Sequence, residues 1–133
     1  MGCGDFQQIR LGEMLEFAFD SGGNLKDNPL DLSSSIDVGG ANKVAVSITP
    51  CSIDLDGATS IEFVFRTAPI NGDAFFAAMQ GGGTNIEMSF NSTNNQFETA
   101  EGLSRFWGLA PKITGSPTSE AKLVCTIDVL LRA

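Results

Sequence analysis

The chain contains no histidine and no tyrosine, and among its 133 residues 1 is tryptophan and 3 are cysteine. Without histidine it lacks the commonest general acid–base group and a frequent metal ligand, so most hydrolytic mechanisms are hard to assemble. We therefore expect no enzymatic activity, no catalytic residue, no metal and no cofactor. A hydrolase built on carboxylate pairs, such as Glu13 with Glu16, is the remote alternative.

Basic residues are also scarce, because 8 Lys and Arg stand against 16 Asp and Glu and leave a net charge of −8. A surface of that sign repels phosphate backbones, so we expect no nucleic-acid partner. No apolar run approaches the roughly 18 residues that cross a bilayer, and the first residues lack the charged and apolar regions of a secretory signal. The sequence predicts neither a membrane protein nor a secreted one.

The three cysteines form no Cys-x-x-Cys motif. Cys3 belongs to a leader, residues 1–5, that we expect to be flexible, whereas Cys51 and Cys125 fall within or beside expected strands. Reduced thiols that act as small core residues are the favoured interpretation. A disulfide between Cys51 and Cys125 stays open.

What the chain has in quantity is phenylalanine and glycine, with 10 Phe and 15 Gly. This composition is typical of short apolar strands separated by flexible turns, and the length suits one domain, residues 1–133. Seven or eight strands at the observed spacing predict an all-β fold, a single antiparallel β-sandwich of jelly-roll type. The expected strands before residue 100 cover residues 6–19, where a short helix is the weaker alternative, and residues 35–38, 43–49, 60–67 and 85–91.

The end of the chain carries the clearest strand pattern. From residue 121 to residue 131 apolar side chains occupy every second position, which is the period of a half-buried strand. Residues 103–113 alternate in the same way, and the segment between them, residues 115–118, has turn chemistry. We therefore expect two long strands joined as a hairpin near the centre of a sheet.

An apolar cluster at residues 74–79 precedes three consecutive glycines. Its large members are Phe75, Phe76 and Met79. Such a cluster either packs into the core or forms an exposed contact patch, and both interpretations stay open. If they are exposed, these three residues are the candidates for contact between subunits or with a capsid.

Two features favour an alternative function, a carbohydrate-binding β-sandwich. Trp107 is either a core residue or a platform on which a sugar stacks. The turn at residues 54–57 supplies Asp54 and Asp56, but the residues that follow do not provide the further oxygen ligands of a calcium loop. An ordinary acidic turn is the favoured interpretation, and a calcium-dependent sugar-binding module stays as the alternative.

The order of these segments resembles that of small tailed-phage capsid cement (decoration) proteins. The resemblance covers most of residues 35–132, and it departs from the pattern in the leader and in the insertion-like residues 74–83. It rests on four stretches of this sequence: Ser-Ile-Asp-Val-Gly at 35–39, the apolar strand at 43–49, Ser-Ile-Glu-Phe-Val-Phe-Arg-Thr at 60–67, and the aromatic strand, turn and alternating strand at 105–129.

This resemblance implies a jelly-roll-like protein that forms a homotrimer and binds the major capsid protein. It implies a place on the outer surface of the virion, where the protein bridges neighbouring capsid subunits and stabilises the shell. The net charge of −8 agrees with a position outside a shell that encloses DNA. Under this interpretation the leader and the loop at residues 21–34 are arms that become ordered on binding.

Overall fold

The computed structural model describes residues 6–30 and 36–133, so the predicted leader and part of the 21–34 loop lie outside the described residues. In the described part no helix is long and apolar enough to span a membrane. The elements are β1 (Phe6–Asp20), β2 (Ile36–Asp37), β3 (Lys43–Asp54), β4 (Ser60–Ala68), the 3₁₀ turn η2 (Asp73–Phe75), β5 (Ala77–Ala78), β6 (Gln80–Gly81), β7 (Thr84–Asn85), β8 (Glu87–Phe90), β9 (Gln96–Glu101), β10 (Phe106–Thr114) and β11 (Glu120–Arg132).

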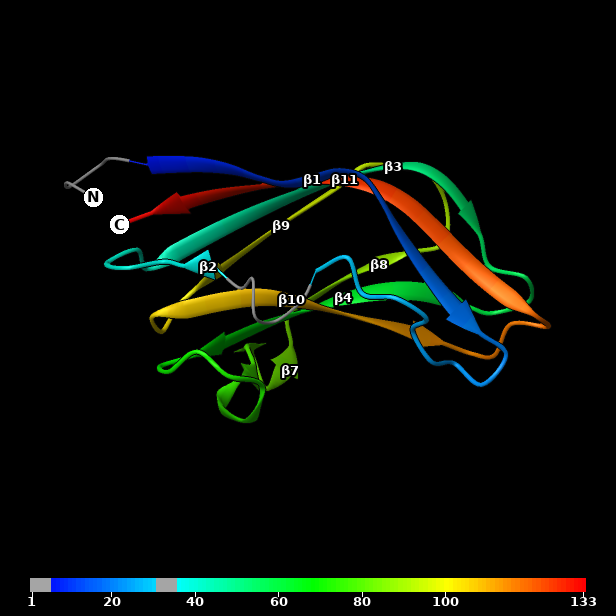
Figure 1. Cartoon of the computed structure of the whole chain (residues 1–133). Coiled ribbons are helices and arrows are strands. Elements are labelled where there is room, and N and C mark those ends of the chain that lie inside the picture. The colour runs from blue at the N-terminus through cyan, green and yellow to red at the C-terminus, as the bar shows by residue number, and fades with distance from the viewer. Residues whose placement is uncertain (1–5, 31–35) are drawn as a thin grey trace.

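Two antiparallel sheets face each other across one core (Figure 1). Sheet A has the strand order β1-β11-β3-β9, and sheet B has the order β2-β10-β4, with β5 and β8 both paired to the far side of β4. Most successive strands cross from one sheet to the other, which is the double Greek key of a jelly roll. The predicted all-β sandwich is confirmed.

The predicted terminal hairpin is wrong, although both of its strands exist. β10 pairs with β2 and β4 in sheet B, whereas β11 pairs with β1 and β3 in sheet A. Residues 115–119 therefore turn a corner between the sheets. Gly115 is required at this corner, because its φ is 83° and an added Cβ would lie 2.9 Å from the Thr59 backbone nitrogen.

The core lies between the two inner sheet faces. The predicted alternation of β11 is confirmed, since residues 121, 123, 125, 127, 129 and 131 are all buried. Phe63 of β4 meets Phe17 of β1 edge to face, with ring centroids 4.9 Å apart, and also meets Phe90 of β8 at 6.0 Å. Aromatic contacts therefore join the two sheets.

Local irregularities bend sheet A. β1 is a strand, as the favoured interpretation had it, but its register against β11 shifts twice between Arg10 and Leu15. The strand predicted over residues 43–49 is longer in the structure, since β3 continues through Pro50 to Asp54. Proline is tolerated there because β9 pairs only with Lys43–Ile48, so that side of β3 needs no N–H donor at residue 50.

Candidate interaction surfaces

Residues 69–86 form an insertion on the outer side of sheet B. β5 and β8 both pair with the same edge of β4. The residues between them turn away from this edge. Met79 N donates to Phe65 O at 2.8 Å, Phe65 N donates to Ile86 O at 2.9 Å, and Ile86 N donates to Met79 O at 2.8 Å. These three bonds hold Met79 and Ile86 together at the base of the β6–β7 hairpin, which covers residues 80–85.

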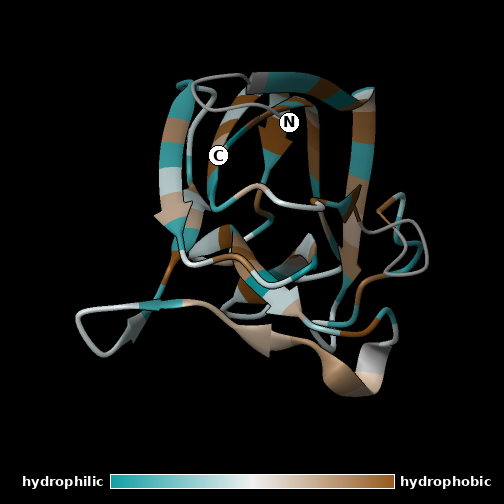
Figure 2. Cartoon of the chain, turned by 90° about the vertical axis from the view of Figure 1, so that its left-hand side faces the viewer, coloured by the Kyte–Doolittle hydropathy of each residue, from teal (hydrophilic) through white to brown (hydrophobic). Residues whose placement is uncertain are grey.

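The hairpin turn explains two of the three glycines. Gly82 and Gly83 have φ values of 64° and 86°, and a two-residue turn that matches the twist of the strands needs φ above zero at both positions. Of the three consecutive glycines, Gly81 ends β6, and Gly82 and Gly83 form the tip of a projecting hairpin. Figure 2 shows this loop reaching beyond the side of the sandwich.

The insertion exposes apolar side chains and carries little charge. Ile70 is 55% exposed and Phe75 is 52% exposed, and Ala74, Ala77 and Ala78 are exposed beside them. Asp73 is the only charged residue in the 18-residue segment 69–86. We name these exposed apolar residues the insertion surface. Its composition is that of a contact patch rather than of a solvated loop.

The structure separates the three predicted contact residues. Phe75 is on the insertion surface, whereas Phe76 and Met79 are each only 6% exposed. Arg66 holds Phe76 in place, because its Nη2 donates to the Phe76 carbonyl at 2.7 Å and its guanidinium lies 6.0 Å from the ring centroid. Met79 packs with the main core. Of the three side chains, Phe75 is the one that a partner can reach in this conformation.

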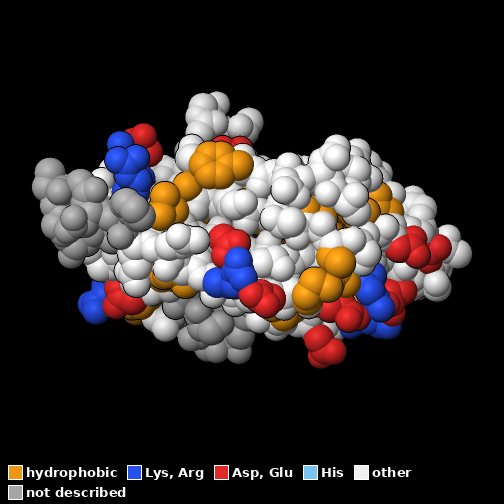
Figure 3. Space-filling view, turned by 90° about the horizontal axis from the view of Figure 1, so that it is seen from above, with side chains coloured by type: hydrophobic (Ala, Val, Ile, Leu, Met, Phe, Trp, Pro, Cys, Tyr) orange, Lys and Arg blue, Asp and Glu red, His pale blue; other side chains and the backbone are white. Residues whose placement is uncertain are grey.

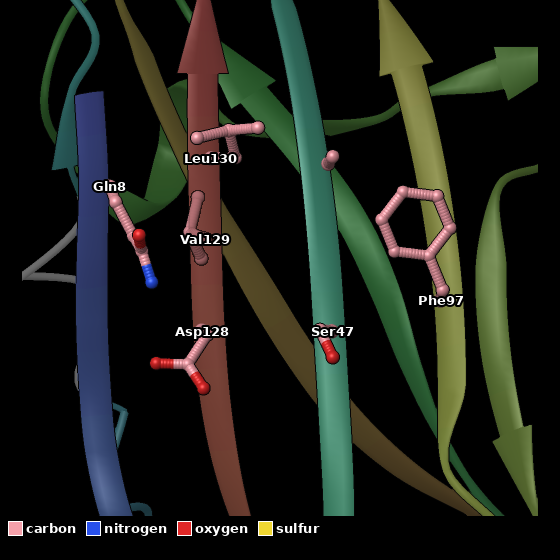
Figure 4. A pocket seen from close by; sticks show the side chains of 7 residues that line it. Gln8, Ser47, Phe97, Asp128, Val129 and Leu130 are labelled. Atoms are coloured by element: carbon pink, nitrogen blue, oxygen red, sulfur yellow. The ribbon is translucent and has the colours of Figure 1, made fainter. Parts of the chain in front are cut away.

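A second exposed aromatic side chain lies on the outer face of sheet A. Phe97 of β9 is 67% exposed, and it stands across β3 from Leu130 of β11, with the small side chains of Ala45 and Ser47 between them (Figure 4). This arrangement leaves a hollow of about 230 Å³. Figure 3 shows the hydrophobic groups of this face as separate patches among polar and charged side chains.

A neighbouring hollow of about 200 Å³ shares Ala45, Phe97 and Leu130 with the first and extends to Lys43 and Arg132. Together the two hollows follow β3 on the outer face of sheet A. The face therefore offers a shallow apolar groove with charged side chains of both signs at one end, since Glu101 lies there beside Lys43 and Arg132. Such a groove suits an apolar side chain of another protein better than a polar small molecule.

An ion-pair cluster lies at the bulged part of β1 beside this groove. Arg10 Nε lies 2.8 Å from an Asp128 carboxylate oxygen, and the same guanidinium also pairs with Glu13. Hydrogen bonds to Asp128 and then to Glu13 raise the pKa of Arg10. These exposed pairs orient the side chains and contribute little stability.

The acidic turn has a structural role. Asp56 accepts hydrogen bonds from Ser119 N at 2.7 Å, from Ser119 Oγ at 3.0 Å and from Glu120 N at 3.1 Å. The backbone N–H groups of Ser119 and Glu120 lower the pKa of the Asp56 carboxyl. Asp56 thus joins the β3–β4 corner to the β10–β11 corner, and one carboxylate oxygen is committed to these donors instead of to calcium.

Trp107 belongs to the core. Its side chain is 0% exposed, and its ring meets Phe65 edge to face at 5.4 Å. A fully buried ring cannot serve as a platform for a sugar. The carbohydrate-binding alternative therefore loses the stacking residue on which it depended.

Cys51 and Cys125 are unbridged, as expected of reduced thiols, but the predicted core position is confirmed for Cys125 and wrong for Cys51. Cys51 is exposed at a bulge of β3, where Pro50 pairs with Cys125 and Ser52 pairs with Val124. Burial raises the pKa of the Cys125 thiol to about 12. The Cys125 thiol is therefore protonated at neutral pH and acts as a small core group.

Sequence reasoning missed Phe97 and Ile70 as exposed residues. In β9 the buried residue is Ala100, so strand alternation places Phe97 on the opposite, outer face. The sequence alone does not show which face of β9 is buried, because this requires knowing that Ala100 faces the core. Ile70 follows Pro69 in a turn, where no periodicity applies.

No protein-family model matches this chain, and no curated protein matches it. Its structure is similar to the crystal structure of the SPBc2 prophage-derived protein YomS, with a TM-score of 0.50. The likeness covers 96% of this chain and 92% of that one, at 15% sequence identity. At this identity the likeness establishes a shared fold.

Proposed function

We propose that the protein is a structural component of a phage virion, which binds the outer surface of the capsid as an oligomer, expected to be a trimer, and stabilises the shell. Two exposed apolar sites on different sides of one small sandwich carry this proposal. Phe75 and Ile70 lie on the insertion at sheet B, and Phe97 lies on the outer face of sheet A. A protein that bridges subunits needs more than one contact surface.

The fold supports the proposal. The segment order resembles that of capsid cement proteins, the chain forms the jelly roll that this resemblance implies, and a similar structure is that of a prophage-derived protein. A protein of this kind needs no catalytic group, since it stabilises the assembled lattice by binding it in preference to the separated subunits.

Charge gives further support. The net charge of −8 suits a surface that faces away from packaged DNA. The insertion surface is almost free of this charge, so association there brings few like charges together. The insertion surface thus differs in charge from the rest of the acidic chain.

The test measures binding to expanded capsids of the phage that encodes the protein. Purified protein is mixed with capsids lacking it, and the capsids are sedimented and heated. We expect saturable binding and a higher temperature of capsid disruption. Absence of binding, or binding without added heat resistance, would refute the proposed function.

The oligomeric state is tested separately by light scattering behind size exclusion. A trimer has three times the chain mass of 14.0 kDa. The measurement is made on free protein and on protein released from capsids, because a trimer that forms only on the shell is also compatible with the proposal.

A further inference from the structure

Asn71 and Gly72 form an asparagine–glycine pair, and none of the other asparagines of the chain is followed by glycine. The peptide nitrogen that follows an asparagine can attack the side-chain amide carbon and close a cyclic imide. Glycine hinders this attack least, because it has no Cβ and its backbone is the most adaptable. The pair is therefore the place in the sequence where spontaneous deamidation meets the lowest steric barrier.

The pair lies between the end of β4 and the start of η2, so no cross-strand ladder fixes its backbone. Asn71 is exposed and Gly72 is half-buried. Phe75 N donates to the Gly72 carbonyl at 3.0 Å, and this carbonyl is not the group that attacks. A bend on the surface reaches the geometry for ring closure more easily than a residue held in a sheet.

A second pair with the same spacing, Asp56 and Gly57, is protected by the fold. The Asp56 carboxylate accepts from Ser119 N at 2.7 Å and from Glu120 N at 3.1 Å. These bonds hold the side chain away from its own backbone and keep it ionised, and a nitrogen nucleophile attacks a carboxylate poorly. The structure thus distinguishes this locked pair from the exposed asparagine–glycine bend.

We propose that Asn71 is a deamidation site and that its conversion weakens the contact made by the insertion surface. The Gly72 nitrogen bonds to Asn71 Cγ, the bond from Cγ to the amide nitrogen breaks, and the amide leaves as ammonia with the Gly72 proton. Water then adds to one of the two imide carbonyls and opens the ring to isoaspartate or aspartate. Water is the sole co-reactant. The loss of contact rests on the proposed function, whereas the conversion itself does not.

The product places a carboxylate within the insertion surface. Ile70 precedes Asn71 and is 55% exposed, and a Cβ added to Gly72 would lie 3.2 Å from the Phe75 ring. The pair is thus flanked by the two large apolar side chains of this surface. The insertion carries one charged residue, and deamidation adds a second charge of the same sign. Desolvating a carboxylate in an apolar contact costs more than desolvating an amide.

Conversion and binding oppose each other. A partner seated on the insertion surface excludes water and restrains the bend that ring closure must distort. Capsid-bound protein should therefore convert more slowly than free protein. Protein that stays free loses its affinity with time, while protein that is already bound keeps it.

The conversion is tested by incubating the natural protein in mildly alkaline buffer and mapping its peptides by mass spectrometry. We expect Asn71 to convert before Asn91 and Asn94, which are exposed in the β8–β9 loop. The rate should rise with pH, because the attacking nitrogen must lose its proton. Gly72→Ala is the matched control, since it keeps Asn71, places its methyl group against the exposed Phe75 ring and is expected to slow the conversion. Earlier conversion at Asn91 or Asn94, or an unchanged rate in Gly72→Ala, would overturn the inference.

The effect of the charge is tested by capsid sedimentation with three variants whose folding is checked by thermal unfolding. Asn71→Asp imitates the product, Asn94→Asp adds the same charge elsewhere, and Asn71→Ser removes the amide without adding charge. We expect Asn71→Asp to bind expanded capsids about tenfold or more weakly, and the two controls to bind like the natural protein. Full binding by Asn71→Asp, or an equal loss in either control, would overturn the inference while the proposed function stands. If no form binds, the proposed function fails and the effect on contact fails with it, while peptide mapping still decides the conversion.

Discussion

Phe75 and Phe76 are neighbours in sequence with opposite environments, and this contrast gives the sharpest prediction. Phe76 is 6% exposed and is held under Arg66, whereas Phe75 is 52% exposed. Replacing a buried Phe by Ala costs about 3 kcal/mol at the lower end of the usual range. Phe76 lies near the surface, so the lower end applies.

The expected change in melting temperature follows from chain length. Unfolding entropy of about 2.1 cal/mol/K per residue gives about 0.28 kcal/mol/K for 133 residues. Phe76→Ala should therefore lower Tm by about 11 °C. Phe75→Ala changes stability by no more than about 0.5 kcal/mol, so its Tm should fall by less than about 2 °C.

The assay combines thermal unfolding with capsid sedimentation. We expect Phe75→Ala to keep its Tm and to lose capsid binding or self-association. We expect Phe76→Ala to show the fall in Tm. Equal falls in Tm for the two variants would refute the assignment of Phe75 to the surface. Full binding and unchanged mass for Phe75→Ala would remove the insertion surface from the proposed function.

Three further predictions concern the core residue Phe63, the corner carboxylate Asp56 and the two cysteines. Phe63→Ala removes the aromatic link between the sheets and should lower Tm by about 11 to 18 °C, a larger loss than Phe97→Ala on the surface, whose Tm should stay nearly unchanged. Because the folded pKa of Asp56 is lowered, its stabilising contribution is present above the ordinary carboxyl pKa and is lost as pH falls through the folded value. The stability gap between natural protein and Asp56→Asn should therefore narrow in acid, and a pH-independent gap in denaturant titrations would contradict this. A thiol reagent should label Cys51 in the folded protein and Cys125 only after unfolding, as mass spectrometry of digested protein would show.

The alternation of residues 121–131 and of residues 61–65 was sufficient to predict buried strands, because side-chain direction in a strand reverses at every residue. Met88 and Phe90 lie two positions apart in the strand predicted over residues 85–91, and both are buried, as the same local rule requires of one strand face. Alternation puts Glu62 on the face opposite Ile61 and Phe63, yet Glu62 is only 4% exposed, with hydroxyl donors Ser60 and Thr114 on one carboxylate oxygen. Whether a side chain on the outer face of a sheet is covered depends on the residues of neighbouring strands. Periodicity within one strand does not predict this.

The sequence by itself determined the fold class, the phases of the strands at residues 61–65 and 121–131, and the separation of an apolar, glycine-rich insertion from the rest of an acidic chain, since these depend on local chemistry. Tertiary structure decided which strands pair. It turned the expected hairpin of β10 and β11 into a corner between two sheets. It also buried Phe76 and left Phe75 exposed, because pairing partners and covering groups such as Arg66 come from distant parts of the chain.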